Sequence, residues 1–293
     1  MFAALVFIGC ENSEHSNSET LEYASVESLA EVEGVINTGL HWKLIDLRKP
    51  KEFEQGHISG AQNVWRTDIT DTTYPYGGMM PTKLHMERLL SRLGIVPSDT
   101  ILIYDDKAVC DAARLWWILK FYGHSHIKLL NGGLTAWKAS GGELTTSTQS
   151  LGVTDYTFES ESDSSLLVMF QSVKSIDDST LVLIDTRGDD EYSGKFHKDG
   201  TAYPGHINGA INLDWASTVD FNGSHKFRSA KELKEIFAVN GVNETTPVIT
   251  YCHSGVRSAH TLFVLKELLG YRNIKNYDGS WIEWSHLHDT LSR

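Results

Sequence analysis

Residues 248–258 read Val248-Ile249-Thr250-Tyr251-Cys252-His253-Ser254-Gly255-Val256-Arg257-Ser258 and lie near the C-terminus of a 293-residue chain. The apolar, β-branched start predicts a buried strand, and the apolar period that follows predicts a helix ending at Gly270. Cys252 thus stands between a strand and a helix N-terminus, where backbone N–H groups, the helix dipole and Arg257 favour an anion. These surroundings lower the pKa of a thiol and favour a nucleophilic thiolate.

A buried structural cysteine is the alternative interpretation of Cys252, because cysteine is among the residues most often found in protein cores. The loop that follows is polar and cationic, and a strand end inside a core has no use for such a loop. We therefore predict that Cys252 is the catalytic residue.

Composition narrows the class of protein. The formal net charge of −12 and the absence of a basic run exclude a typical nucleic-acid-binding surface. The three cysteines, Cys10, Cys110 and Cys252, are far apart without metal-ligand spacing, so we expect no metal site and no cofactor. No apolar run reaches the length of a membrane-spanning helix.

The N-terminus has a pattern of its own. Residues 1–8 are almost wholly apolar, Gly9-Cys10 follows, and residues 11–19 are polar. This resembles the end of a bacterial lipoprotein signal, although no positive segment precedes it. Cys10 is therefore a lipidation candidate, and we expect the protein in the cell envelope or periplasm, anchored to the membrane through that lipid. A frayed terminus on a cytoplasmic protein is the alternative.

The chain repeats itself. Leu44-Ile45-Asp46-Leu47-Arg48 returns as Leu183-Ile184-Asp185-Thr186-Arg187, and Gly56-His57-Ile58-Ser59-Gly60-Ala61 returns as Gly205-His206-Ile207-Asn208-Gly209-Ala210. A repeat of this length indicates a duplicated domain. Alternating strands and helices predict an α/β fold with a doubly wound parallel sheet in each half. We place a signal-like tether at 1–20, domains at 21–144 and 166–293, and a surface linker at 145–165.

Aligning the two halves without gaps, Tyr104 on Tyr251, places Asp105 opposite Cys252 and Cys110 opposite Arg257. The first domain therefore has no nucleophile where the second has one. Cys110 lies beyond the strand end without the Ser-Gly turn, and we interpret it as structural.

Taken together, these paired motifs, with the cysteine only in the second copy, resemble the tandem-domain rhodanese (sulfurtransferase) family. The resemblance covers nearly all of the chain from about residue 21. It implies that Cys252 takes a sulfur from thiosulfate or 3-mercaptopyruvate as a persulfide and passes it to cyanide or a thiol. The backbone of His253, Ser254, Gly255 and Val256 would surround that sulfur, and Arg257 would add positive charge for an anionic donor.

The donor is less clearly indicated. Mercaptopyruvate enzymes of the family use arginines shortly after the second Asp-x-Arg motif, and Glu191 stands where one is expected here. Thiosulfate is therefore the favoured donor and 3-mercaptopyruvate the alternative. Lys195 or Lys198 could substitute for that arginine, but we interpret both as solvated loop charges. Arg187 is a further candidate for substrate binding, and His253 either attracts anions when protonated or points into solvent.

Two rival functions remain. A cysteine phosphatase has a Cys-x5-Arg loop, whereas the loop from Cys252 to Arg257 is one residue shorter and suits a single sulfur atom. A non-enzymatic sulfur carrier or partner-docking module is the rival of another class. His57 and His206 recur in both halves, so we predict structural roles for them. We expect a monomer.

Overall fold

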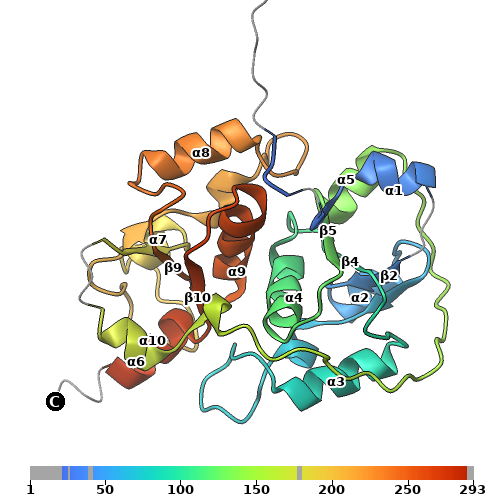
Figure 1. The fold of residues 1–293 in the computed structure, drawn as a ribbon, viewed down its shortest axis with the longest axis horizontal. Helices are drawn as coiled ribbons and strands as arrows, with labels where there is room; N and C mark the ends of the chain where they lie inside the picture. Colours follow the sequence, from blue (N-terminus) through green and yellow to red (C-terminus); the bar gives the residue numbers. More distant parts are fainter. Residues whose placement is uncertain (1–21, 26, 39–41, 177–179, 289–293) are drawn as a thin grey trace, which may run out of the picture.

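The computed structural model describes residues 22–25, 27–38, 42–176 and 180–288. These residues form two five-stranded sheets, and every strand pair in them is parallel. The strand orders β1-β5-β4-β2-β3 and β6-β10-β9-β7-β8 are the same arrangement used twice. This confirms the predicted pair of doubly wound α/β domains (Figure 1).

The first domain contains the strands β1 (Leu29–Ala30), β2 (Lys43–Asp46), β3 (Ala61–Asn63), β4 (Ile101–Tyr104) and β5 (Ile127–Leu130). Its helices are α1 (Val32–Thr38), α2 (Pro50–Glu54), α3 (Lys83–Arg92), α4 (Cys110–Phe121), α5 (Gly133–Ala139) and the 3₁₀ turn η1 (Arg66–Ile69).

The second domain contains the strands β6 (Leu167–Val168), β7 (Val182–Asp185), β8 (Ile211–Asn212), β9 (Val248–Tyr251) and β10 (Ile274–Tyr277). Its helices are α6 (Phe170–Lys174), α7 (Asp189–Tyr192), α8 (Ala230–Ala238), α9 (Val256–Phe263) and α10 (Ser280–His288). The 3₁₀ turns η2 (Ser164–Leu166) and η3 (Trp215–Thr218) and the π-helical turn η4 (Val264–Leu268) complete it.

The central strands β4 and β9 are buried along their whole length, as their apolar sequences require of strands covered on both faces. Both end at the same edge of their sheets as their neighbours, because all the strands are parallel. The loops that follow β4 and β9 therefore stand where ligands bind in open α/β sheets, outside the carboxyl ends of the strands.

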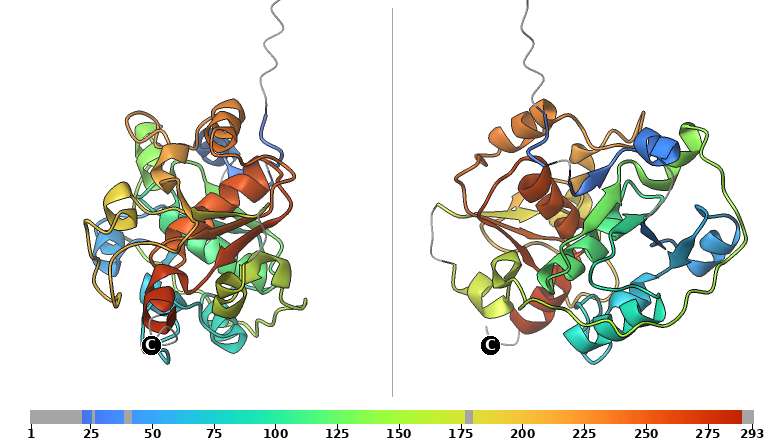
Figure 2. Two further views of the ribbon diagram at one scale, coloured as in Figure 1. Left: turned by 90° about the vertical axis from the view of Figure 1, so that its left-hand side faces the viewer. Right: turned by 45° about the vertical axis from the view of Figure 1, so that its right-hand side comes forward.

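Helices α4 and α9 join the two domains. They lie side by side between the sheets in Figure 1, and Figure 2 shows the same green and red helices adjacent after rotation. The Trp116 and Phe263 rings meet edge to face, with their centroids 4.9 Å apart. One cluster of buried apolar residues continues from the first domain into the second. The interface is thus part of the core, and it fixes the first domain's loops against the loop of Cys252.

Two predicted segments differ from the structure. The sequence pattern of residues 26–40 predicts a short amphipathic helix, but the structure has the shorter α1 there, because Leu29 and Ala30 pair as β1 with Leu129 and Leu130 of β5. The linker expected at 145–165 is not only a surface segment, because Tyr156 and Phe158 are buried in the core.

The N-terminal expectations are not tested. Cys10 lies outside the described residues, so its lipidation and the envelope location stay predictions. Among residues 22–288, apart from the gaps given above, no helix is long and apolar enough to cross a membrane.

Candidate active site

Strand β9 and helix α9 together position Cys252. The thiol residue follows the strand directly and is 1% exposed. Gly255 then adopts a left-handed φ of +76° and caps α9. A Cβ atom at this position would lie 2.8 Å from the carbonyl oxygen of Asp278, so a residue with a side chain does not fit. The loop is therefore a tight turn closed over the sulfur.

The side chain of Ser280 stabilises this turn through two hydrogen bonds. Its Oγ accepts the backbone N–H of Cys252 at 3.1 Å and that of Gly255 at 3.0 Å. Ser280 itself has a φ of +53°, an uncommon conformation for a residue with a side chain. Its counterpart in the repeat is Gly133, which adopts a φ of +56° without that cost. The strained backbone of Ser280 thus occurs at the position where a hydroxyl group accepts the N–H groups of the Cys252 loop.

The surroundings of the Cys252 thiol favour its ionised form. Burial raises its pKa, but the charge of Arg257 and the N–H and hydroxyl groups of Ser258 lower it, and the net pKa lies below the ordinary value. Ser258 Oγ donates to the sulfur at 3.6 Å. Cys110 behaves in the opposite way, because burial and the neighbouring Asp111 raise its pKa well above the ordinary value. The pKa values of the two thiols are therefore shifted in opposite directions.

The first domain contains the corresponding loop, and there the carboxylate of Asp105 accepts the backbone N–H groups. Asp105 Oδ1 accepts the backbone N–H of Lys107 at 2.7 Å and that of Val109 at 2.8 Å, and Oδ2 accepts that of Ala112 at 2.9 Å. In the alignment of the halves, Asp105 is the counterpart of Cys252. A loop of this shape thus surrounds the end of a side chain with backbone donors.

A pocket with a volume of about 300 Å³ opens beside the loop that follows Cys252, at the junction of the domains. Its lining comes from both domains: Arg66, Ile69, Thr70, Gly77, Gly78 and Arg114 from the first, and Lys198, His253, Ser254, Val256 and Ile282 from the second.

The charges around this pocket are mostly paired. Three arginines each face a carboxylate, in the pairs Arg66–Asp111, Arg114–Asp278 and Arg257–Glu191. Lys198 also lines the pocket, and within the described part of the chain no carboxylate lies at ion-pair distance from its ammonium group. Partial removal from water and the charge of Arg257 lower the pKa of Lys198. Lys198 is thus the positive charge of the pocket lining that no carboxylate pairs with, and since its side chain remains exposed, it is also solvated, as expected of a loop charge.

His253 differs from both expectations. The residue is 8% exposed, so it does not point into solvent. Burial and the charge of Lys198 lower its pKa to about 3, so it is neutral at physiological pH and attracts no anion through charge. Its Nδ1 is buried without a hydrogen-bond partner in the described chain, next to the pocket. His253 therefore offers a neutral hydrogen-bonding group to a ligand.

Arg187 lies elsewhere. It is 2% exposed, its Nη2 contacts Asp185 at 2.5 Å and donates to the Gly205 carbonyl at 2.7 Å, and its guanidinium lies 5.1 Å from the Trp281 ring centre. These contacts hold the end of β7, and Arg187 does not line the pocket. The expected contact with substrate is not supported.

Arg257 lies next to Cys252, as expected, but its charge is paired. Its guanidinium is not free to bind a sulfur donor, because Glu191 accepts two hydrogen bonds from it.

His57 and His206 have structural contacts. Their Nδ1 atoms bond the carbonyls of Phe53 and Tyr192, and each ring stacks on that same residue.

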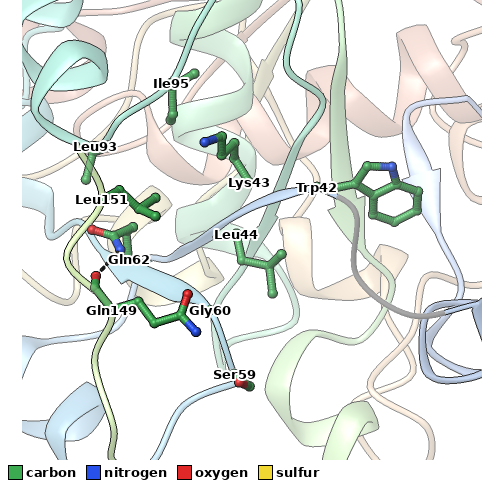
Figure 3. Close-up of a pocket in the computed structure, with 10 residues that line it drawn as sticks. All are labelled: Trp42, Lys43, Leu44, Ser59, Gly60, Gln62, Leu93, Ile95, Gln149 and Leu151. Atoms are coloured by element: carbon green, nitrogen blue, oxygen red, sulfur yellow. Dashed lines mark hydrogen bonds between the residues drawn. The ribbon is translucent and has the colours of Figure 1, made fainter. Parts of the chain in front are cut away.

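A second pocket, of about 350 Å³, lies in the first domain near the start of β2 (Figure 3). Lys43 there donates to the Gly94 carbonyl at 2.8 Å, and Gln62 donates to the Gln149 carbonyl at 2.9 Å. Its lining residues include no cysteine. The described residues also contain no group of three or more His, Cys, Asp or Glu side chains placed to hold a metal ion.

Comparisons with known proteins agree with this geometry. Residues 28–140 and 171–287 each match the rhodanese-like domain. A Mycobacterium bovis protein, provisionally named thiosulfate sulfurtransferase 1, is 37% identical over 242 residues, which cover 80% of this chain and 85% of that protein. The sulfur carrier protein TtuD of Thermus thermophilus is 34% identical over 245 residues, with coverages of 80% and 84%.

Among solved structures, SseA from Escherichia coli, described as a 3-mercaptopyruvate sulfotransferase, superposes with a TM-score of 0.74 at 26% identity. The match covers 87% of this chain and 98% of SseA. The first matched segment contains all five strands of its sheet, and the second contains β7, β8, β9 and β10 of the other sheet together with Cys252 and its loop. The chain therefore belongs to the rhodanese family and is a sulfurtransferase with two tandem rhodanese-like domains.

Proposed function

We propose that the protein transfers the outer sulfur of thiosulfate to cyanide or a thiol through a persulfide on Cys252. The Cys252 thiolate attacks the outer sulfur, an S–S bond forms, and the S–S bond of thiosulfate breaks as sulfite leaves with the electron pair. The acceptor then attacks the outer persulfide sulfur and releases the thiolate. The observation that carries this proposal is the lowered pKa of a thiol set among backbone donors at the start of α9.

An anionic donor suits the charges of the pocket. The attack brings a thiolate and a dianion together, so positive charge beside the reacting sulfur stabilises the transition state. Lys198 supplies it, since the pocket's arginines are paired. The neutral His253 adds a hydrogen-bonding nitrogen whose state does not change near neutral pH.

3-Mercaptopyruvate is the second candidate, and the likeness to SseA favours it. Its carboxylate also needs a cation, and Glu191 already occupies Arg257. Thiosulfate therefore remains the preferred donor. A sulfur carrier is the non-enzymatic alternative, which the name of the Thermus relative supports.

The test is a steady-state comparison of the two donors on one preparation, with cyanide as acceptor and thiocyanate as the product measured. We expect turnover with thiosulfate at the higher kcat/KM, its loss in Cys252→Ser, and its retention in Cys110→Ser. A higher kcat/KM for 3-mercaptopyruvate would reverse the choice of donor. Loading of Cys252 without turnover would favour the carrier.

A further inference from the structure

Arg114 connects the domain without a nucleophile to the loop of the nucleophile. It lies on α4 and is 3% exposed. Its Nη2 contacts Asp278 Oδ1 at 2.6 Å and donates to the Gly78 carbonyl at 2.9 Å. Its Nη1 donates to the carbonyl of Gly255 at 3.3 Å. A single guanidinium thus contacts the turn beside Cys252, the segment before Ser280, and a first-domain loop.

The fold alone does not require an arginine here. The counterpart of Arg114 on α9 is Thr261 in the alignment of the halves. A buried guanidinium is costly to remove from water unless its N–H groups find partners. Arg114 meets that condition through partners from both domains, and it lies 5.0 Å from the ring centre of Trp117. Its contacts therefore point to a task at the domain junction.

The contact with Gly255 sets the direction of one peptide unit. In a trans peptide, the carbonyl of one residue and the N–H of the next point to opposite sides. The Gly255 carbonyl points to Arg114, with Asn276 Nδ2 at 3.4 Å as a second donor. The N–H of Val256 in that same peptide is thereby turned away from Arg114.

The first domain indicates what this N–H binds. The counterpart of Val256 is Val109, whose N–H donates to Asp105 Oδ1. An aspartate oxygen is the second atom beyond Cβ, and so is the outer sulfur of a cysteine persulfide. Asp105 therefore marks the position that the outer sulfur on Cys252 would occupy, among the same backbone donors.

We propose that Arg114 is a positioning residue for the persulfide: by holding the Gly255 carbonyl, it directs the Val256 N–H at the outer sulfur of Cys252. This inference rests on the proposed persulfide of Cys252. It also gives the first domain a role in the reaction, through a residue that need not touch the substrate.

The test is the equilibrium between free enzyme plus thiosulfate and persulfide enzyme plus sulfite, with the persulfide fraction measured by intact mass. We expect Arg114→Met to lower the equilibrium constant about tenfold, since a hydrogen bond to an anion is lost. The Cys252 thiolate pKa, measured by ultraviolet absorbance against the matching Cys252→Ser protein, should stay near that of the wild type, since Ser258 and Arg257 set it.

Arg48→Met is the matched control, because it also breaks a buried arginine–aspartate pair, Arg48–Asp46, away from the pocket. It should lower stability and leave the equilibrium constant unchanged. Arg114→Lys covers the case in which Arg114→Met does not fold, with a smaller change in the same direction. An equilibrium constant equal to that of the wild type in either folded Arg114 variant would overturn the proposal.

Failure of the thiosulfate proposal would look different. In that case the wild type itself would not load from thiosulfate. Inorganic polysulfide then installs the persulfide, giving up one sulfur atom to the thiolate, and transfer of the outer sulfur to a small monothiol, which becomes a persulfide as Cys252 returns to the thiolate, is followed instead. The equilibrium constant of this transfer should be about tenfold higher in Arg114→Met than in the wild type, for the same physical reason, and equal constants would again count against the inference.

Discussion

Glu191 holds the guanidinium of Arg257 through two hydrogen bonds, Nη1 to Oε2 at 2.5 Å and Nη2 to Oε1 at 2.9 Å. The exposed fractions of the two side chains are only 17% and 13%. The positive charge that lowers the pKa of Cys252 is therefore also neutralised by a carboxylate from α7. Glu191 competes with any anionic donor for Arg257.

Removing that competition should favour thiosulfate. We expect Glu191→Gln to lower the KM for thiosulfate about tenfold, or ~1.4 kcal/mol, because no carboxylate then compensates the positive charge of Arg257. The Cys252 pKa should fall further for the same reason. Initial rates over a range of thiosulfate concentrations measure the first effect. Asp189→Asn is the control, because Asp189 lies on the same short helix and its side chain is 74% exposed. A KM that stays constant or rises in Glu191→Gln would contradict the competition.

Lys198 should act in the opposite direction. Since it is the lining cation without a carboxylate partner in the described residues, we expect Lys198→Met to raise the KM for thiosulfate about tenfold. Lys195→Met offers a matched comparison from the same loop, because Lys195 already faces Asp189 and is 68% exposed. Equal KM values for the two variants would remove Lys198 from donor binding.

The sequence was sufficient for features that depend on neighbours along the chain. The strand before Cys252, the turn at Gly255 and the repeat that aligns Asp105 with Cys252 were all visible in the order of residues. The conformation of that turn follows from local sterics. Only a glycine fits at position 255, because its φ is left-handed and a Cβ atom there would contact the carbonyl oxygen of Asp278 too closely.

Features that depend on packing between the domains were not visible. Arg114 and Arg66 reach the pocket from the first domain, and nothing in their local sequence indicates it. The burial of His253 likewise comes from the neighbouring segments, so its charge state could not be predicted. Ser280 differs, because the sequence does contain a signal for its role: a serine stands where the first copy has Gly133.

Arg187 provides a test of the structural interpretation. Its pair with Asp185 repeats the pair of Arg48 with Asp46, and all four side chains are at most 5% exposed. Breaking a buried pair leaves an unpaired charge, so we expect Arg187→Met and Arg48→Met each to lower the free energy of unfolding by about 3–5 kcal/mol. Chemical denaturation measures this. A raised KM for thiosulfate in Arg187→Met, without the loss of stability, would restore its predicted contact with substrate.

His260 predicts a pH dependence of stability. Its ring lies 4.9 Å from that of Trp215 and 5.0 Å from that of Phe227, and burial lowers its pKa to about 3. An unfolded histidine has a pKa of about 6.5. The folded state therefore binds fewer protons between these values, so this contribution is complete above pH about 6.5 and declines as the pH falls towards 3.

His260→Phe removes the proton and keeps an aromatic ring. Between pH about 7 and about 4.5, the wild type should lose about 2–3 kcal/mol more stability than this variant. Urea unfolding at both pH values gives the difference. Equal losses would show that His260 is protonated in the folded protein.

The persulfide itself is tested most directly by a single loading reaction. The protein is exposed to thiosulfate without an acceptor, and the peptides containing Cys252 and Cys110 are weighed while released sulfite is quantified. We predict that the Cys252 peptide gains the mass of one sulfur atom, that sulfite appears in equal amount, and that cyanide reverses the gain. A sulfur found on Cys110, or sulfite released with Cys252 unchanged, would contradict the assignment of Cys252 as the sulfur-accepting nucleophile.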